Sequence, residues 1–370
     1  MLEGIDDIDW ASIKGNQFGR GPEVAEHLRL LTDAERANES ELAIMLSYDG
    51  RWAPTTDAAV PFLVELLYEP SAPRLPLIRL FEELLLEEGE GSAVGLDPHE
   101  RRGKKLLRNK RRRAVYEALA GALEVVLPGL TAPDAELREA TADALCWVAR
   151  PELIAPVVLD AMSTEEVSAV RERLLLCLGY QRTYLRNPKA KGRDRAVEPR
   201  TEEALLGALE GDLAGVAATA LALADDALPD QAFAVLRDRV LAHRRVWRRG
   251  DPLEEKWLTL ANDLFLAAYP SWRSAIVDAL AELYDSVEDD YASIVARDAV
   301  LVSCRTARVD RPGVPHYTVK GLDPAHPDEV QRRALKLALS RPGAFGGALR
   351  ERLGFLGFAT DRSALQAMLA

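Results

Sequence analysis

The side chains of this sequence that could bind an anionic partner gather in three basic segments. They are residues 101–113, with nine arginines and lysines, residues 182–200, and residues 237–249 around Trp247. Clustered cations bind phosphates or acidic protein surfaces, and Arg and Trp are enriched at protein-binding hot spots. The expected partner-binding residues are Arg101, Arg102, Lys104, Lys105, Arg108, Lys110, Arg111, Arg112, Arg113, Arg186, Lys189, Lys191, Arg193, Arg244, Arg245, Trp247 and Arg248.

Motifs for catalysis or metal binding begin in several places but are not completed. Gly103-Lys104 invites comparison with a phosphate-binding P-loop, but Pro98 stands where the first glycine of that motif belongs. His99-Glu100 lacks the second histidine of a zinc-protease helix. His316 and His326 lie in a proline-rich segment without a third ligand in view. We therefore expect no catalytic residue, no metal and no cofactor.

Cysteines and carboxylates are also better explained by structure than by reactivity. Cys146, Cys177 and Cys304 are few and lie inside helical patterns, which indicates reduced, buried thiols of a cytoplasmic protein. Adjacent acids such as Glu82-Glu83 point to different faces of a helix and solvate it. A catalytic pair would need two acids that face each other across a pocket.

Charge is distributed unevenly along the 370 residues, whose net charge is −12. Residues 1–100 carry 7 basic and 21 acidic side chains, whereas residues 101–200 carry 20 and 13. A net acidic protein is a poor nonspecific ligand for nucleic acid, although its basic middle could contact an anion locally. Because no apolar run approaches about 18 residues, we expect no membrane partner.

A repeat organises the middle of the chain, between Thr131 and Gly179. Aligning Arg138 on Arg171 gives an offset of 33 residues and superposes Leu145 on Leu178. Each copy is a short acidic turn followed by an amphipathic helix. A period of this size is typical of a helical solenoid, in which stacked helix pairs bury a continuous core.

Apolar residues recur at helical spacing through most of the chain, for example at Val60, Leu63, Val64 and Leu67. Pro61 fits a first helical turn, where its missing N–H costs nothing. The expected helices cover Glu23–Leu31, Asp33–Tyr48, Ala58–Leu67, Pro76–Glu88, Ala114–Val126, Ala135–Ala149, a helix ending near Gly179, Thr201–Leu209, Leu213–Ala224, Asp230–Arg245, Leu253–Tyr269, Ser271–Tyr284, a helix ending near Val302, and a closing pair around Leu349–Phe355 and Ser363–Leu369.

The fold class expected from these patterns is all-α: a single α-solenoid of stacked antiparallel helix pairs over residues 1–370. Residues 1–21 form an irregular lead-in. Loop insertions are expected at residues 89–113, 182–200 and 306–327, where Gly, Pro and charged residues interrupt the repeat.

Two elements of the sequence resemble HEAT repeats. The segment Pro133–Thr141 and its echo from Pro327 to Leu335 resemble a second HEAT helix, with Pro-Asp followed by an aliphatic residue and Arg. Residues 59–67 and 154–162 are similar to a first HEAT helix, with Pro before aliphatics. With Ile8–Gly15, they resemble bacterial HEAT-repeat proteins. The resemblance implies a right-handed, armadillo-like superhelix with a concave protein-binding surface.

Two functions from different classes follow. The first is a non-catalytic protein-binding scaffold or adaptor, whose narrower form is a regulator or a toxin-neutralising partner. The alternative is a nucleic-acid-binding HEAT-like enzyme of the DNA-glycosylase type that uses the basic segments. The net charge of −12 disfavours the alternative, as does the placement of two basic segments in loop insertions.

Overall fold

The structure is a computed structural model, and helices make up almost all of the secondary structure of its described residues. One antiparallel ladder is the exception, in which Ser47 of β1 (Ser47–Tyr48) pairs with Trp52 of β2 (Arg51–Trp52). The predicted all-α class is confirmed at this level. The structure describes residues 2–33, 35–48, 51–86, 110–186, 197–224, 228–245, 265, 272–304 and 322–370.

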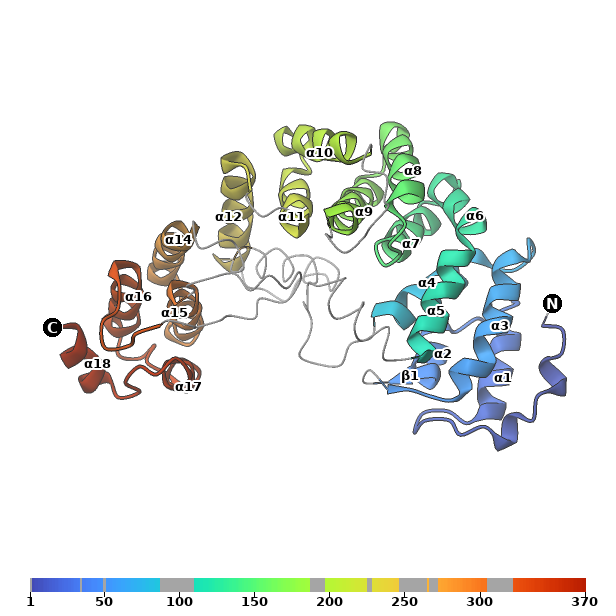
Figure 1. The fold of residues 1–370 in the computed structure, drawn as a ribbon, viewed down its shortest axis with the longest axis horizontal. Helices are drawn as coiled ribbons and strands as arrows, with labels where there is room; N and C mark the ends of the chain where they lie inside the picture. The colour runs from blue at the N-terminus through green and yellow to red at the C-terminus, as the bar shows by residue number, and fades with distance from the viewer. Residues whose placement is uncertain are drawn as a thin grey trace. The chain divides into compact units, whose positions relative to one another are not determined.

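Contacts divide the chain into two compact units, Met1–Ala224 and Asp225–Ala370, which are considered separately. In the first unit, the helices follow one another from blue to yellow-green (Figure 1). Its elements are the 3-10 turns η1 (Ile5–Asp7) and η2 (Trp10–Ser12), α1 (Gly21–Leu30), α2 (Glu39–Leu46), α3 (Thr55–Tyr68), α4 (Arg74–Leu86), α5 (Lys110–Gly121), α6 (Leu123–Val126), η4 (Leu127–Thr131), α7 (Ala135–Leu145), α8 (Pro151–Thr164), α9 (Ser168–Arg186), α10 (Glu198–Gly207), η5 (Ala208–Glu210) and α11 (Ala214–Ala224).

Helices of the first unit pack on their near neighbours in sequence. One series of contacts joins α2, α4, α7, α9 and α11, each to the next. A second set, which includes α1, α3, α8 and α10, packs against the first. Leu145, Leu178 and Ala220 are fully buried at these contacts, so small and aliphatic side chains fill the core.

The second unit contains α12 (Asp230–Arg245), α14 (Arg273–Ser286), α15 (Asp289–Ser303), α16 (Glu329–Ser340), α17 (Gly347–Phe355) and α18 (Arg362–Leu369). Helix α14 packs on α12, α15 and α16, and α15 packs on α17. The predicted apolar face of α14 is confirmed, since Ile276, Leu280, Leu283 and Tyr284 are all buried. The predicted closing pair corresponds to α17 and α18.

Side-chain caps fix several helix starts. Asp134 accepts a hydrogen bond from the backbone N–H of Glu136 at the start of α7. At the start of α16, Asp328 and Gln331 form a reciprocal capping box. Both caps belong to the Pro-Asp segments that the sequence repeats, so the repeated Asp satisfies backbone donors at the two helix N-termini.

The predicted helix Asp33–Tyr48 is wrong at both ends. Helix α2 begins at Glu39 because Asn38 caps it, accepting a hydrogen bond from the backbone N–H of Glu41. Asp33 instead closes a turn, its carbonyl accepting from Arg36 and Ala37. The helix stops at Leu46, where the chain enters the β1–β2 ladder.

The predicted position of Pro61 in a first helical turn is also wrong. Helix α3 starts at Thr55, which places Pro61 in its interior. Proline there leaves the carbonyl one turn earlier without its usual helical N–H donor. Burial of Phe62, Leu63 and Leu66 on neighbouring turns keeps this segment helical despite the lost hydrogen bond.

The helix predicted over Ala114–Val126 is interrupted at Ala122. Helix α5 ends at Gly121, and α6 continues after a bend of 60° into η4. The Gly121 carbonyl, near the end of α5, accepts a hydrogen bond from the hydroxyl of Tyr68. The bend allows Leu123 and Val126 to be buried.

Two of the predicted insertions have helical ends. Helix α9 runs to Arg186, since Tyr184 and Leu185 are buried in the packed unit, and α10 begins at Glu198. Likewise, α5 begins at Lys110 within the first basic segment. The predicted helix Leu253–Tyr269 lies outside the described residues, apart from Phe265. The single array over residues 1–370 stays a prediction.

Candidate functional site

The predicted partner-binding residues are placed only in part. Lys110, Arg111, Arg112 and Arg113 form the first turn of α5, and Arg186 ends α9. Arg244 and Arg245 end α12 in the second unit. The structure describes these residues by their backbone alone. The other residues of the predicted set lie outside the described residues: Arg101, Arg102, Lys104, Lys105, Arg108, Lys189, Lys191, Arg193, Trp247 and Arg248.

The start of α5 is electrostatically unusual. Four basic residues occupy its first turn, and no acidic residue lies there. Four neighbouring cations of this kind attract anions.

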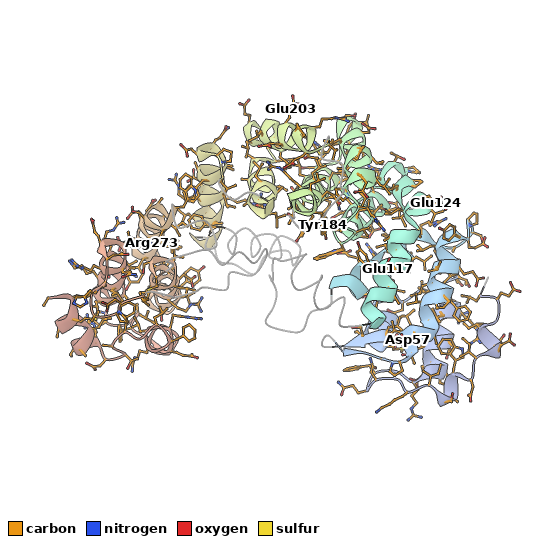
Figure 2. The ribbon with its side chains drawn as sticks, viewed as in Figure 1. Asp57, Glu117, Glu124, Tyr184, Glu203 and Arg273 are labelled. Atoms are coloured by element: carbon orange, nitrogen blue, oxygen red, sulfur yellow. The ribbon has the colours of Figure 1, made fainter. Side chains whose placement is uncertain are left out.

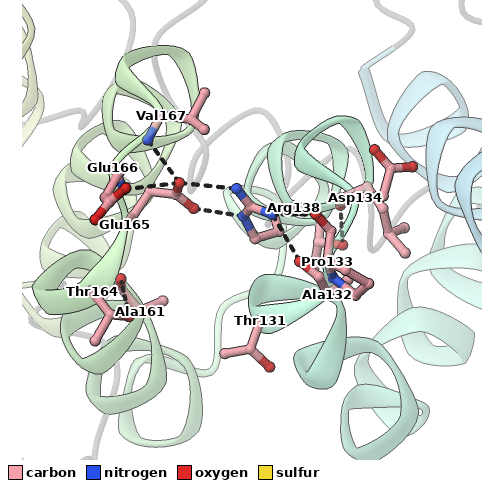
Figure 3. A network of polar contacts seen from close by, with 12 residues as sticks. Thr131, Ala132, Pro133, Asp134, Arg138, Ala161, Thr164, Glu165, Glu166 and Val167 are labelled. Atoms are coloured by element: carbon pink, nitrogen blue, oxygen red, sulfur yellow. Dashed lines mark hydrogen bonds and ion pairs between the residues drawn. The ribbon is translucent and has the colours of Figure 1, made fainter.

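The best-defined polar site joins α7 to the turn before α9 (Figure 3). Arg138 donates from Nε to Glu165 Oε2 at 2.6 Å and from Nη2 to Glu165 Oε1 at 3.0 Å. Its Nη1 group donates to the carbonyls of Ala132 and Pro133. Glu165 also accepts from the backbone N–H of Val167. The site therefore fixes two turns against each other.

The pKa shifts of Arg138 and Glu165 indicate a structural role for this pair. Hydrogen bonds from Arg138 hold the pKa of Glu165 below its ordinary value. The same contact raises the pKa of Arg138. Both groups are thus held in their charged forms, and neither is poised to exchange a proton near neutral pH.

Further polar side chains of α9 are buried against α7. The Nε of Arg173 lies 3.0 Å from Glu139 Oε1 and 3.4 Å from Asp143 Oδ2. Near the other end, Gln181 Nε2 donates to the carbonyls of Leu145 and Val148, at 2.8 and 3.0 Å. Burial of polar groups is compatible with folding when they are hydrogen-bonded in this way.

Tyr184 completes the contacts of α9 with the C-terminal end of α7. Its hydroxyl donates to the carbonyl of Cys146 at 3.1 Å. Tyr184 is labelled on α9 in Figure 2. Two side chains of α9 therefore donate hydrogen bonds to three backbone carbonyls at the C-terminal end of α7, where the usual helical donors are missing. Trp147 packs near them, with its ring centroid 5.5 Å from that of Tyr180.

The three cysteine thiols are buried, as predicted. Burial raises the pKa of Cys146 well above its ordinary value and that of Cys304 to about 11. A thiolate is the nucleophilic form of cysteine, so these two thiols are unreactive near neutral pH.

The predicted absence of a metal site rests on sequence, and His316 lies outside the described residues. His326 is exposed, with Nδ1 2.8 Å from Asp323 Oδ2. This contact lowers the pKa of Asp323. In the part of the chain that the structure describes, no three His, Cys, Asp or Glu side chains are grouped as metal ligands.

A cavity that the sequence does not predict lies where α4, α6, η4 and α7 meet. Its volume is about 360 Å³. Arg74 and Glu124 carry the charged groups among its lining residues. The apolar part of the lining comes from Ile78, Val125, Val126, Pro128, Ala132 and Leu137. Only the bend at Ala122 brings α6 and η4 beside α4 and α7, so no local sequence pattern reveals this site.

No single helix among the described residues is long and apolar enough to cross a membrane. One bent pair, Ala114–Gly121 with Leu123–Thr131, has sufficient combined length and apolar character. Much of this pair is buried against neighbouring helices, including Val115, Leu119 and Leu130.

Comparisons with known proteins identify no relative. No protein-family model matches the sequence. No curated protein matches it either. The HEAT-repeat resemblance stays a prediction.

Proposed function

We propose that this chain is a non-catalytic protein-binding scaffold of the cytoplasm, built as a HEAT-like α-solenoid of stacked helix pairs. The observation that carries the proposal is the order in which the helices of the first unit contact one another. Helices α2, α4, α7, α9 and α11 each pack on the next one in the series, as repeats of a solenoid do. Such a fold offers a long surface while its interior is devoted to packing.

Ion pairs between successive helices support this proposal. Arg79 of α4 contacts Glu136 of α7, Arg138 of α7 contacts Glu165 ahead of α9, and Arg171 of α9 lies 4.0 Å from Asp212 ahead of α11. The charged groups that face other helices thus serve the stacking of repeats. Their arrangement provides a framework for a binding surface.

Affinity capture of the intact chain tests the proposal. We expect a tagged chain, purified from cells that naturally produce it, to retain one protein in stoichiometric amount at physiological salt. Cross-linking followed by mass spectrometry would place that protein on the chain. Loss of every protein partner, together with turnover of a substrate by the purified chain, would overturn the proposal. A regulator or a toxin-neutralising protein is the narrower form, in which the partner's activity falls on binding.

Nucleic-acid binding is the second candidate, favoured by the four basic residues in the first turn of α5. It predicts a gel shift with duplex DNA or RNA that weakens steeply as salt rises. Neutralising Arg111, Arg112 and Arg113 together would then reduce the salt dependence. No shift at low salt would eliminate this candidate and leave the scaffold proposal intact.

A further inference from the structure

The cavity between α4, α6, η4 and α7 has the lining of a binding pocket. At about 360 Å³ it falls in the size range of ligand pockets, roughly 300–1,000 Å³. Val125, Ala132 and Leu137 are each only half-buried, so apolar surface stays open to solvent there. Covering that surface would favour binding through the hydrophobic effect.

The inner part of the pocket offers no unsatisfied hydroxyl donor. Thr141 is fully buried, and its hydroxyl donates to the carbonyl of Leu137 at 2.6 Å. Gly129 lets η4 approach this residue closely, since a Cβ at position 129 would lie 2.4 Å from Thr141 Oγ1. The inner lining therefore suits an uncharged, apolar group.

Charged residues of opposite sign accompany the apolar lining. Arg74 is half-buried and donates one guanidinium N–H to the carbonyl of Leu67, while other N–H donors remain on the same group. Glu124 is exposed on α6 (Figure 2). Because the two charges cancel, the pocket selects neither a cation nor an anion. A neutral group with both a donor and an acceptor complements them best.

A peptide group has these properties, with an N–H for the carboxylate and a carbonyl for the guanidinium. Tyr68 adds a recognition residue beside Glu124. Its side chain is 44% exposed, and its pKa is raised by burial and by the neighbouring Glu124 carboxylate. Tyr and Arg are the residue types most enriched at protein-binding hot spots.

On the basis of the protein-binding function proposed above, we propose that this pocket receives one apolar side chain of a partner polypeptide. The partner's adjacent peptide group is bound by Arg74 and Glu124. An aliphatic side chain the size of leucine fits within the volume. The pocket is thus a specificity site for a neutral, aliphatic segment, and it is separate from the basic first turn of α5.

Disulfide capture of small probes tests the pocket without knowledge of the partner. Pro128 lines the pocket and is exposed, so Pro128→Cys places a reactive thiol there, whereas the native thiols are buried. The probes are three disulfides with one linker that end in an N-isobutyl amide, an alkylammonium or an alkylcarboxylate. Ser163→Cys is the control, since Ser163 is exposed near the acids Glu165 and Glu166 and does not line the pocket.

Under reducing competition, we expect Pro128→Cys to capture the N-isobutyl amide at least about fivefold better than either charged probe, because each buried methylene favours binding about fourfold. Ser163→Cys should show no such preference for the amide. Adding Ala132→Trp, which fills the pocket, should abolish the preference in a protein with unchanged far-ultraviolet circular dichroism. Adding Glu124→Gln should reduce it while leaving the fold intact. Equal capture of all three probes at position 128, or a preference that survives Ala132→Trp, would overturn the inference.

The partner experiment separates this inference from the proposed function. If Ala132→Trp retains the captured protein at full affinity, the scaffold proposal stands and the pocket is not its binding site. If probe capture succeeds, no partner protein is found and the purified chain turns over a substrate, the pocket stands as a site for neutral apolar groups and the scaffold proposal fails. Loss of the captured protein in Ala132→Trp and its retention in Ser163→Cys would support both.

Discussion

Arg138 of α7 and Glu165, which lies ahead of α9, share two hydrogen bonds of 2.6 and 3.0 Å. The side chain of Glu165 is 5% exposed and that of Arg138 is 15% exposed. Arg171, the residue that the 33-residue period aligns with Arg138, likewise lies near an acid ahead of the next helix, Asp212. The period thus corresponds to a contact that is repeated from α7 to the turn before α9 and from α9 to the turn before α11.

Replacing Glu165 with Gln should destabilise the first unit by about 2 kcal/mol, because it leaves Arg138 charged and partly buried without its counter-ion. The remaining bonds of Arg138 to two backbone carbonyls keep the loss below that of a fully isolated charge. Urea unfolding followed by circular dichroism measures the change. Glu166→Gln is the matched control at the adjacent exposed position and should alter stability by less than about 0.5 kcal/mol. Equal effects of the two substitutions would contradict a special role for Glu165.

The same pair predicts a pH dependence. The pKa of Glu165 is lowered in the folded protein by its hydrogen bonds from Arg138. A lowered folded-state pKa stabilises the protein above the unfolded glutamate value of about 4.3 and loses that effect as pH falls through the folded value. The stability gap between wild type and Glu165→Gln should therefore be full near neutrality and shrink below about pH 4. A gap that stays constant over this range would show that Glu165 does not act through its charge.

A close helix contact gives the third prediction, at Gly179 of α9. A Cβ there would lie 2.7 Å from the carbonyl oxygen of Ala220 and 2.8 Å from its Cα. Alanine gains about 1 kcal/mol of helix propensity over glycine, but a contact with backbone atoms costs about 1–3 kcal/mol through overpacking. We expect the contact to dominate, so Gly179→Ala should lower the unfolding free energy.

Gly207 supplies the control for this comparison. It is also helical, and a Cβ there would have no neighbour within 4 Å. Gly207→Ala should leave stability unchanged or raise it by up to about 1 kcal/mol. If Gly179→Ala is stabilising to the same extent, α9 and α11 are not packed as closely as described.

Periodic patterns predicted the helices well where local signals and packing agree. The helices predicted to begin at Ala135 and at Asp230 start at these residues, as α7 and α12. The patterns failed to predict helix bounds where a distant contact or a nearby cap determines where the helix begins or ends. Asn38 moved the start of α2, and the bend at Ala122 follows from packing that no single segment encodes.

The candidate site was less predictable than the fold. Arg and Lys residues are visible in a sequence as charge clusters, so the basic segments were the predicted binding site. Gln181, Tyr184 and the pocket lining have ordinary local surroundings, and their roles arise when α9 meets α7 or when η4 meets α4. A glutamine and a tyrosine shortly after the apolar run Leu174–Leu178 were the available signal, since buried polar residues need a partner.

Gln181 and Tyr184 give the fourth prediction, because together they satisfy carbonyls at the end of α7. Gln181→Leu would remove two side-chain hydrogen bonds, one each to the carbonyls of Leu145 and Val148, which keep backbone donors from Val148 and Arg150, and should cost about 2 kcal/mol. Tyr184→Phe removes one bond to the Cys146 carbonyl and should cost about 1 kcal/mol. Chemical denaturation ranks the two variants, and the reverse order would refute this assignment of the hydrogen bonds.

The buried thiols give a last prediction, which also bears on catalysis. Cys146, Cys177 and Cys304 are at most 2% exposed, and the pKa of Cys304 is raised to about 11 by burial. Because a disulfide reagent needs both access and a thiolate, none of the three should react rapidly in the folded protein. Ellman's reagent should titrate all three only after guanidinium unfolding, and the slow reaction of the native protein should follow the rate of local opening. Cys304→Ser tests the thiol of the second unit. This substitution should lower by one the number of thiols that react after unfolding, and it should not change any rapid reaction of the native protein. A rapid, stoichiometric reaction in the native protein would instead identify an accessible, activated cysteine and would support covalent catalysis by this residue.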